Sequence, residues 1–326
     1  MACRRGFVDN LVMRRIEVKQ LDYDLTPVGG LALVGHYLKA LTPQWAKLDG
    51  VLPVRCGVSN SDVLRSYLGL LVHGKSDFDA VETYRGDKFF KEALGISLLP
   101  SSPTLRQRLD AQAGAMFEHV PGMIERLLGS QRPDYGVLAC GWLPLDVDTF
   151  AMDNGGTAKE GVGRTYAGVD GYCPLAAYLG SHGFCLELAL RPGVQHSTRE
   201  TDFNLERVIP LAQRLSAAGP RAPILARLDL ERLPSGKFDT NYLVCQLAAL
   251  AMNILRLMGQ RGLLGPDAPV RHPAKRRRIK TVMQELIYRA GRVIEHGRRL
   301  ILGLGANDRS AKAFARLNGE LFAASS

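Results

Sequence analysis

Two short apolar segments, roughly eighty residues apart, carry aspartates at their carboxyl ends. One covers residues 143–149 (LPLDVDT) and the other residues 223–229 (PILARLD). Carboxylates at the ends of neighbouring strands favour hard divalent cations such as Mg²⁺ or Mn²⁺, and such ions can cleave and join phosphodiesters. We therefore expect Asp148 and Asp229 to bind a metal, with Asp146 as a further ligand. The alternative is that Asp148 caps the following turn and Asp146 is exposed.

The elements that must position these aspartates alternate between strand and helix. We expect, in chain order, strands at residues 137–147, 174–179 and 184–190, a helix at 205–215 and a strand at 223–228. Gly180-Ser181-His182-Gly183 has the composition of a hairpin turn. A right-handed crossover through the helix returns the last strand beside the first, so that Asp148 and Asp229 lie side by side.

The first part of the chain shows helical periodicity from about residue 31 to residue 128. Ser102-Pro103 is a typical helix start, because a capping residue precedes proline at a position where no amide donor is needed. The helix that begins there carries Arg106 and Arg108, whose side chains suit phosphates and base edges. It is therefore a candidate DNA-reading helix, and the alternative is an ordinary surface helix.

Positive charge is concentrated near the carboxyl end. The chain of 326 residues has a formal net charge of +10, and residues 271–299 contain ten Lys or Arg and only two Glu. A local excess of this kind is typical of a nucleic-acid partner, although a solvated helix face or an anionic membrane would also accept it. We expect this segment to enter a helix through Ile294. The DNA-binding candidates are Arg271, Lys275, Arg276, Arg277, Arg278 and Lys280, with Lys159 and Arg164 in the Gly-rich stretch 154–171.

Several other classes of protein are disfavoured. The six cysteines form no CxxC pair, so neither a zinc site nor a redox motif is indicated, and the chain suits the cytosol. The amino-terminal segment lacks the apolar core of a secretory signal. The apolar stretch 243–258 contains Gln246, Asn253 and Arg256, and we expect a core helix rather than a membrane span.

Long strings of this sequence resemble bacterial insertion-sequence transposases that carry an acidic-triad (DDE) site on an RNase-H-like fold. The strings are SSPTLRQRLD, LPLDVDTFAMDNGGTAKEGVGRTYAGVDGYCPLAAYLGSHG, LELALRPGVQHS, PILARLD, LERLPSGKFDTN and PVRHPAKRRRIKTVMQELIYRAGRVIEHGRRL. The resemblance covers most of the chain from about residue 30.

The resemblance implies Asp148 as the first catalytic acid and Asp229 as the second. The family's third acid is a glutamate on a helix beyond the second aspartate, and here ARLD runs directly into LERLPSGKF. This implies an internal deletion that removes the third acid. The candidates for a third acid after Asp229 are Glu231, Asp239 and Glu285, and none lies in a fitting context.

The fold class implied is α/β, with an RNase-H-like mixed sheet core between a helical amino-terminal and a basic helical carboxyl-terminal region. The expected boundaries are 1–135 for the DNA-binding helices, 136–230 for the shortened core and 231–326 for the basic region. The implied function is a DNA transposase that binds element ends and cuts and joins strands with Mg²⁺. The alternative is a truncated remnant that binds DNA only. The expected partners are double-stranded DNA and a second copy of the chain, in the bacterial cytoplasm at the nucleoid and not at a membrane.

Overall fold

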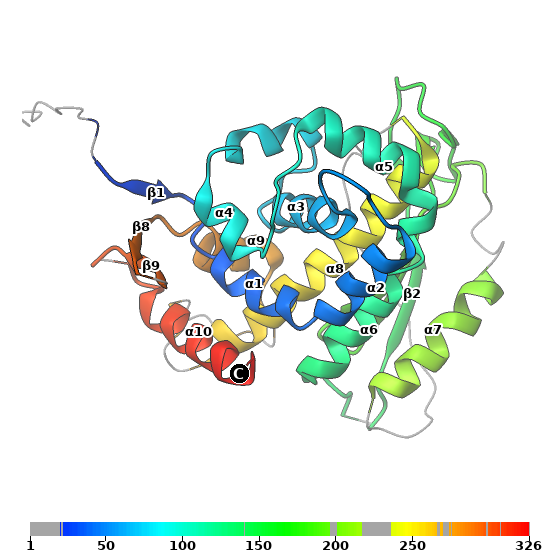
Figure 1. The fold of residues 1–326 in the computed structure, drawn as a ribbon. Helices are drawn as coiled ribbons and strands as arrows, with labels where there is room; N and C mark the ends of the chain where they lie inside the picture. Colours follow the sequence, from blue (N-terminus) through cyan, green and yellow to red (C-terminus); the bar gives the residue numbers. More distant parts are fainter. Residues whose placement is uncertain are drawn as a thin grey trace, which may run out of the picture.

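The computed structural model describes residues 20, 22–139, 141–195, 201–216, 236–265, 268–269, 274, 276–297, 299–306 and 308–325. In this part of the chain about half of the residues are helical, and three small antiparallel sheets of three strands each accompany the helices. The fold is therefore mixed α/β. Figure 1 shows one long helix, α8, crossing the middle of the molecule between two of the sheets.

The amino-terminal region is helical, as its periodicity predicts. Its elements are α1 (Leu31–Lys39), α2 (Thr42–Val51), α3 (Asn60–Val72), the 3₁₀ helix η1 (Phe78–Tyr84), α4 (Lys88–Ala93), α5 (Ser102–Phe117) and α6 (Val120–Gln131). Short polar side chains begin these helices. The Ser59, Asp87 and Ser101 side chains accept from the backbone N–H of residues 62, 90 and 104. The predicted start at Ser102-Pro103 is confirmed to within one residue, because Ser101 is the cap.

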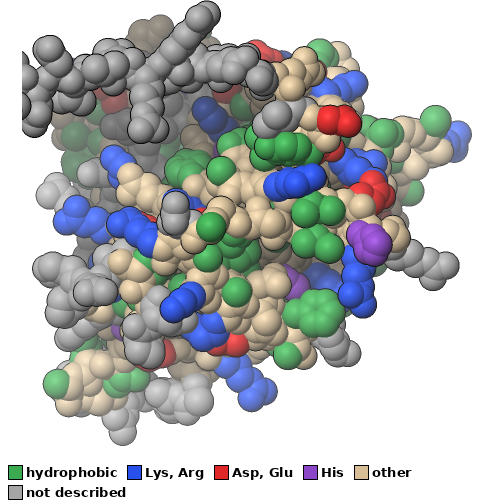
Figure 2. Space-filling model, turned by 90° about the vertical axis from the view of Figure 1, so that its left-hand side faces the viewer, with side chains coloured by type: hydrophobic (Ala, Val, Ile, Leu, Met, Phe, Trp, Pro, Cys, Tyr) green, Lys and Arg blue, Asp and Glu red, His purple; other side chains and the backbone are tan. Residues whose placement is uncertain are grey.

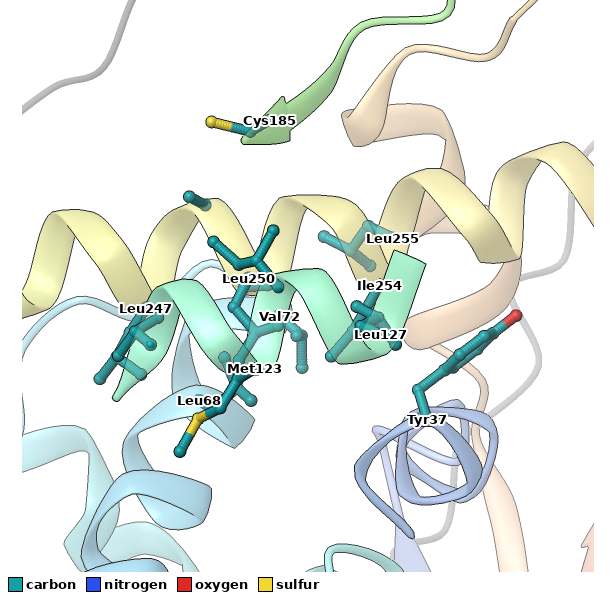
Figure 3. Packing of buried hydrophobic residues seen from close by; sticks show 14 of the residues in the cluster. Tyr37, Leu68, Val72, Met123, Leu127, Cys185, Leu247, Leu250, Ile254 and Leu255 are labelled. Atoms are coloured by element: carbon teal, nitrogen blue, oxygen red, sulfur yellow. The ribbon is translucent and has the colours of Figure 1, made fainter. Parts of the chain in front are cut away.

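Helix α8 (Phe238–Gly262) is the centre of the core. Its Leu247, Leu250 and Ile254 lie against side chains of α6 and α3, as Figure 3 shows. Within the described chain it is the one helix long and apolar enough to span a membrane, and 83% of its apolar window is buried inside the protein. That burial is typical of a core helix, as predicted.

The main sheet has the order β2-β6-β7, with every pair antiparallel. Its strands are β2 (Leu145–Thr149), β6 (Leu175–Leu179) and β7 (Phe184–Ala189). The hairpin predicted around residues 180–183 is confirmed. The strand predicted over 137–147 begins only at Leu145, because Gly141 with φ +79° and the Leu138–Trp142 backbone hydrogen bond form a turn before it.

A second small sheet lies between β2 and β6 in sequence, with the order β3-β5-β4. It is formed by β3 (Met152–Asp153), β4 (Gly163–Arg164) and β5 (Asp170–Tyr172). The Gly-rich stretch is therefore an ordered insertion between β2 and β6, and not an irregular loop. It docks on the start of α8, where Glu160 accepts a hydrogen bond from the Phe238 N–H at 3.1 Å. Helix α7 (Thr201–Leu215) follows β7 and contacts both β7 and α6.

The carboxyl-terminal region differs from the prediction of a continuous helix. It starts with α9 (Ile279–Val282) and a π-helix, η2 (Met283–Ile287), and then forms a hairpin of β8 (Gly291–His296) and β9 (Arg299–Leu304) before α10 (Ala311–Ser325). Strand β1 (Asp24–Thr26) completes this third sheet, in the order β1-β8-β9. The helical expectation through Ile294 is wrong, because Gly297 with φ +59° reverses the chain and residues 291–296 pair antiparallel with residues 299–304. A single amphipathic membrane-binding helix over 279–294 is therefore also excluded.

Candidate functional site

The two predicted carboxylates of the first segment lie on one face of β2. Asp146 pairs with Tyr178 across the antiparallel ladder and Asp148 pairs with Ala176, so these four side chains share a face. Both aspartates are half-buried. Half-buried carboxylates on an otherwise apolar strand need positive charge or hydrogen-bond donors close by.

A cation of the basic segment lies near Asp146. Burial raises the pKa of the Asp146 carboxyl above its usual range, and the nearby Arg276 guanidinium lowers it in part. The Asp148 Oδ1 atom accepts a hydrogen bond from the Thr149 N–H at 2.8 Å. Asp148 therefore uses one carboxylate oxygen within its own strand, because Thr149 is the last residue of β2.

Tyr178 extends this face towards α8. The tyrosine is buried, and its pKa is raised above the usual value chiefly by burial, with Asp148 and Arg256 close enough to influence it electrostatically. Arg256 is buried on α8 and also lies near Arg276. The face of the sheet that carries the aspartates thus meets two arginines, one exposed and one buried.

Helix α8 is fixed to the sheet by side-chain amides. Asn253 accepts from the Cys185 N–H at 2.8 Å and donates to the Cys185 carbonyl at 2.7 Å. Seven residues earlier, Gln246 donates to the Leu188 carbonyl at 3.2 Å. Two helical turns span about 10 Å, close to the length of three strand residues, so the two amides match the edge of β7. Arg256 follows Asn253 by less than one turn and is held at the sheet by the same anchor.

The opposite face of the sheet has its own buried acid. Glu187 pairs with Ala177 across the ladder, so it points away from Asp146 and Asp148. It binds Arg207 of α7 at 2.5 Å and accepts from Gln246 at 3.0 Å. Glu187 is therefore a structural acid and does not join the two aspartates.

The predicted arginines of α5 make contacts within the protein. The Arg106 guanidinium lies over the Phe78 ring, 5.2 Å from its centroid. Arg108 donates to the Val58 carbonyl at 3.2 Å and to Asn60 Oδ1 at 2.7 Å. Arg108 therefore helps to hold the loop before α3, and neither arginine lies in the candidate site.

The two basic residues of the Gly-rich stretch also have partners. Lys159 donates to Asn154 Oδ1 at 3.1 Å, and the exposed Arg164 forms an ion pair with Asp170 at 3.4 Å. Tyr166 is 63% exposed beside them, and its hydroxyl donates to the Thr149 carbonyl at the end of β2. This insertion therefore reaches the carboxylate strand through Tyr166.

The basic segment itself is only partly described. Asp229, Arg271 and Lys275 lie outside the described residues, so the predicted approach of Asp148 to Asp229 is not tested. Arg276, Arg278 and Lys280 are exposed, whereas Arg277 donates to the Leu263 carbonyl at 2.9 Å. Figure 2 shows Lys and Arg spread among hydrophobic side chains on the face near β1, β8 and β9, rather than gathered in one stripe.

Of the three candidates for a third acid, the two that the structure describes, Asp239 and Glu285, do not complete a triad. Glu285 is buried in η2, where Arg309 and Ser310 both donate to its carboxylate. Asp239 is exposed in the first turn of α8, and Glu231 is outside the described residues. In the described ranges no group of three or more His, Cys, Asp or Glu side chains could hold a metal ion.

Sequence reasoning missed Arg256 as a site residue. Arg256 interrupts the apolar stretch of α8. In the sequence analysis it served only as evidence against a membrane span. The available signal was the single arginine of the apolar stretch 243–258, which is otherwise typical of a core, where a charge is rare unless it has a partner. Comparison with known proteins adds no relative, because no family model, no curated protein and no solved structure matches this chain.

Proposed function

We propose that the protein binds double-stranded DNA as a relative of bacterial insertion-sequence transposases. The observation that carries the proposal is the position of Arg276, which donates to the Ser181 carbonyl in the β6-β7 turn and lies close enough to Asp146 to influence it electrostatically. The most basic segment of the chain thereby meets the strand that the sequence resemblance assigns to catalysis. A phosphate attracted by Arg276 and Arg278 would be delivered beside Asp146 and Asp148, where phosphodiester chemistry of this family would need it.

The topology of the main sheet supports an RNase-H-like core. Such a core begins with three antiparallel strands in sequential order and a helix that returns the chain to the first strand. Strands β2, β6 and β7 have that order, and α7 follows them. The returning strand would be residues 223–228, beside β2, and these lie outside the described residues.

The described residues fit DNA binding better than metal-dependent cleavage. They offer two carboxylates on one face, one of which accepts a backbone hydrogen bond, and no three-ligand cluster. A bound Mg²⁺ would supply Lewis-acid chemistry, but these residues alone do not make a site for it. We therefore propose binding without cleavage as the activity of this chain. Cleavage and strand transfer at Asp148 and Asp229 is the second candidate, favoured by the adjacent carboxylates.

DNA binding is tested by fluorescence anisotropy with a duplex that carries the element's terminal repeats, at several salt concentrations. The variant with both Arg276→Gln and Arg278→Gln should bind more weakly and should flatten the plot of log affinity against log salt by roughly two units. The control carries Lys47→Gln and Arg126→Gln, which remove the same charge from exposed positions on α2 and α6. Equal slopes for the two variants, or an affinity that does not depend on salt, would refute the proposal.

Cleavage is tested on the same duplex with Mg²⁺ or Mn²⁺. Nicking that is lost in Asp148→Asn and kept in Asp153→Asn would establish the second candidate, because Asp153 is an exposed acid on the neighbouring strand β3. Binding by the wild-type protein without nicking would establish the DNA-binding remnant.

A further inference from the structure

A small cavity lies between α8, the β6-β7 turn and the basic segment. It is lined by His182, Arg256, Gly259, Gln260, Leu264, Arg276 and Arg277, and its free volume is about 10 Å³. Three of these residues are arginines and none is acidic. Two carboxylates lie beside the wall, since Asp134 Oδ2 is 3.8 Å from His182 Nδ1 and Asp146 is near Arg276, but neither lines the cavity. A concave wall that is itself lined by several cations and no carboxylate is an environment for an anion.

Arg256 is the buried member of this wall. Its residue is 9% exposed, and its Nε–H has no hydrogen-bond partner. Its Nη1 donates to the Arg277 carbonyl at 3.2 Å, and none of the ion pairs among the described residues includes it. Burial, with a smaller contribution from Arg276, lowers the pKa of Arg256 to about 10. Burying a guanidinium with an unused N–H donor and no neighbouring carboxylate destabilises the folded protein, unless an anion from solution binds to it.

The rest of the cavity is held in place by contacts within the protein. His182 Nδ1 and Gln260 Nε2 both lie within hydrogen-bond distance of the Asp134 carbonyl, at 2.8 and 2.7 Å. The exposed Arg276 donates to the Ser181 carbonyl at 3.3 Å, which places its guanidinium over the β6-β7 turn. The wall is thus formed before a ligand arrives, and Arg276 is the most exposed of its lining residues.

We propose that this cavity binds one oxygen of a phosphate-class oxyanion, with Arg256 as the buried donor and Arg276 at the entrance. The free volume admits about one water-sized atom, so a single oxygen enters and the rest of the anion stays at the surface. Guanidinium groups suit oxyanions, because their N–H groups are arranged as a planar fork. The inference rests on the proposed function only for the source of the phosphate, which would be a phosphodiester of bound DNA.

The test measures thermal unfolding of the full chain in sodium phosphate and in sodium sulfate, against sodium chloride at equal ionic strength. A phosphate concentration near 100 times its Kd should raise the wild-type Tm by roughly 4 °C. Arg256→Met and Arg276→Gln should each lose this rise, and Arg278→Gln, which removes an exposed arginine outside the cavity, should keep it. Arg256→Met should also have a Tm in chloride no lower than wild type, because it removes a buried unpaired charge.

If Arg256→Met does not fold, the test relies on Arg276→Gln. Arg276 is exposed, so its substitution should leave the fold intact. The same rise in all four proteins would overturn the oxyanion site, and so would chloride giving the same Tm as phosphate. The anisotropy assay then separates the two proposals. A phosphate-dependent rise without DNA binding would refute the DNA function and keep the site for free phosphate. DNA binding without any phosphate-dependent rise would refute the site and keep the function.

Discussion

A fall in pH should destabilise the protein through one buried histidine. His73, at the end of α3, is 3% exposed, and burial lowers its pKa from 6.5 to about 4. Its Nδ1 lies 2.6 Å from the Gly69 carbonyl and its Nε2 lies 3.0 Å from the Tyr84 hydroxyl. Since a carbonyl only accepts, Nδ1 carries the proton and Nε2 accepts from Tyr84. The folded protein therefore holds a neutral imidazole that has no place for a second proton.

The sign and size of the effect follow from this lowered pKa. Above pH 6.5 the histidine is neutral in both folded and unfolded chains, and pH has no effect through it. Between pH 6.5 and 4, His73 is protonated in the unfolded chain but stays neutral in the folded protein. The free energy of unfolding therefore falls as the pH falls. A difference of about 2.5 pKa units corresponds to about 3 kcal/mol lost by pH 4.

The assay is urea unfolding at pH 7.5, 6, 5 and 4. The matched variant replaces both members of the pair, His73→Phe and Tyr84→Phe, so that no hydroxyl is left without its partner. Its free energy of unfolding should fall by about 3 kcal/mol less than that of the wild type between pH 7.5 and 4. His296→Gln, at an exposed position on β8, is the control and should follow the wild type. Parallel curves for wild type and the double variant would refute the reasoning.

Three further changes test the contacts that hold the core together, each by urea unfolding at pH 7.5. Asn253→Leu should cost about 3 kcal/mol, because it leaves both backbone groups of Cys185 unpaired in the interior; a loss below 1 kcal/mol would contradict the edge anchor. Gly180→Ala should cost more than Gly297→Ala: both have positive φ, but a Cβ at 180 would lie 1.8 Å from a backbone oxygen and a Cβ at 297 meets nothing. Glu285→Gln should lower stability by about 2 kcal/mol with or without Mg²⁺, because this carboxylate has internal donors; a Mg²⁺-dependent difference would instead make it a ligand.

Local signals in the sequence were sufficient where neighbouring residues alone decide the structure. The capping side chain of α5, and the glycines at 180 and 183 with φ of +74° and +69°, act within four residues of themselves. They predict a helix start and the hairpin turn correctly. The prediction of a strand over residues 137–144 is wrong. The apolar composition of this segment does not indicate the turn at Gly141.

The carboxyl-terminal hairpin depends on distant partners. Residues 279–287 fulfil the helical periodicity, but the chain then pairs β8 with β1, which is more than 260 residues earlier in the sequence. No local pattern specifies such a pairing, and Val293 and Ile294 suit a strand as well as a helix. By contrast, Asp146 and Asp148 share a face of β2 because side chains alternate along a strand, and this alternation can be read from the sequence alone. The approach of Arg276 to that face arises only when α8 and the basic segment pack on the sheet.

Helix α8 links the stability of the fold to the charge of the site. Its Asn253 completes the edge of β7, and three residues later its Arg256 places an unpaired cation in the same interior. A sequence selected for stability alone would carry an apolar side chain such as methionine at position 256, because burial of the guanidinium is not repaid by any described carboxylate. Natural proteins retain such costly groups where activity needs them. The oxyanion that we propose for the Arg256 cavity would offset that cost, close to the face that carries Asp146 and Asp148.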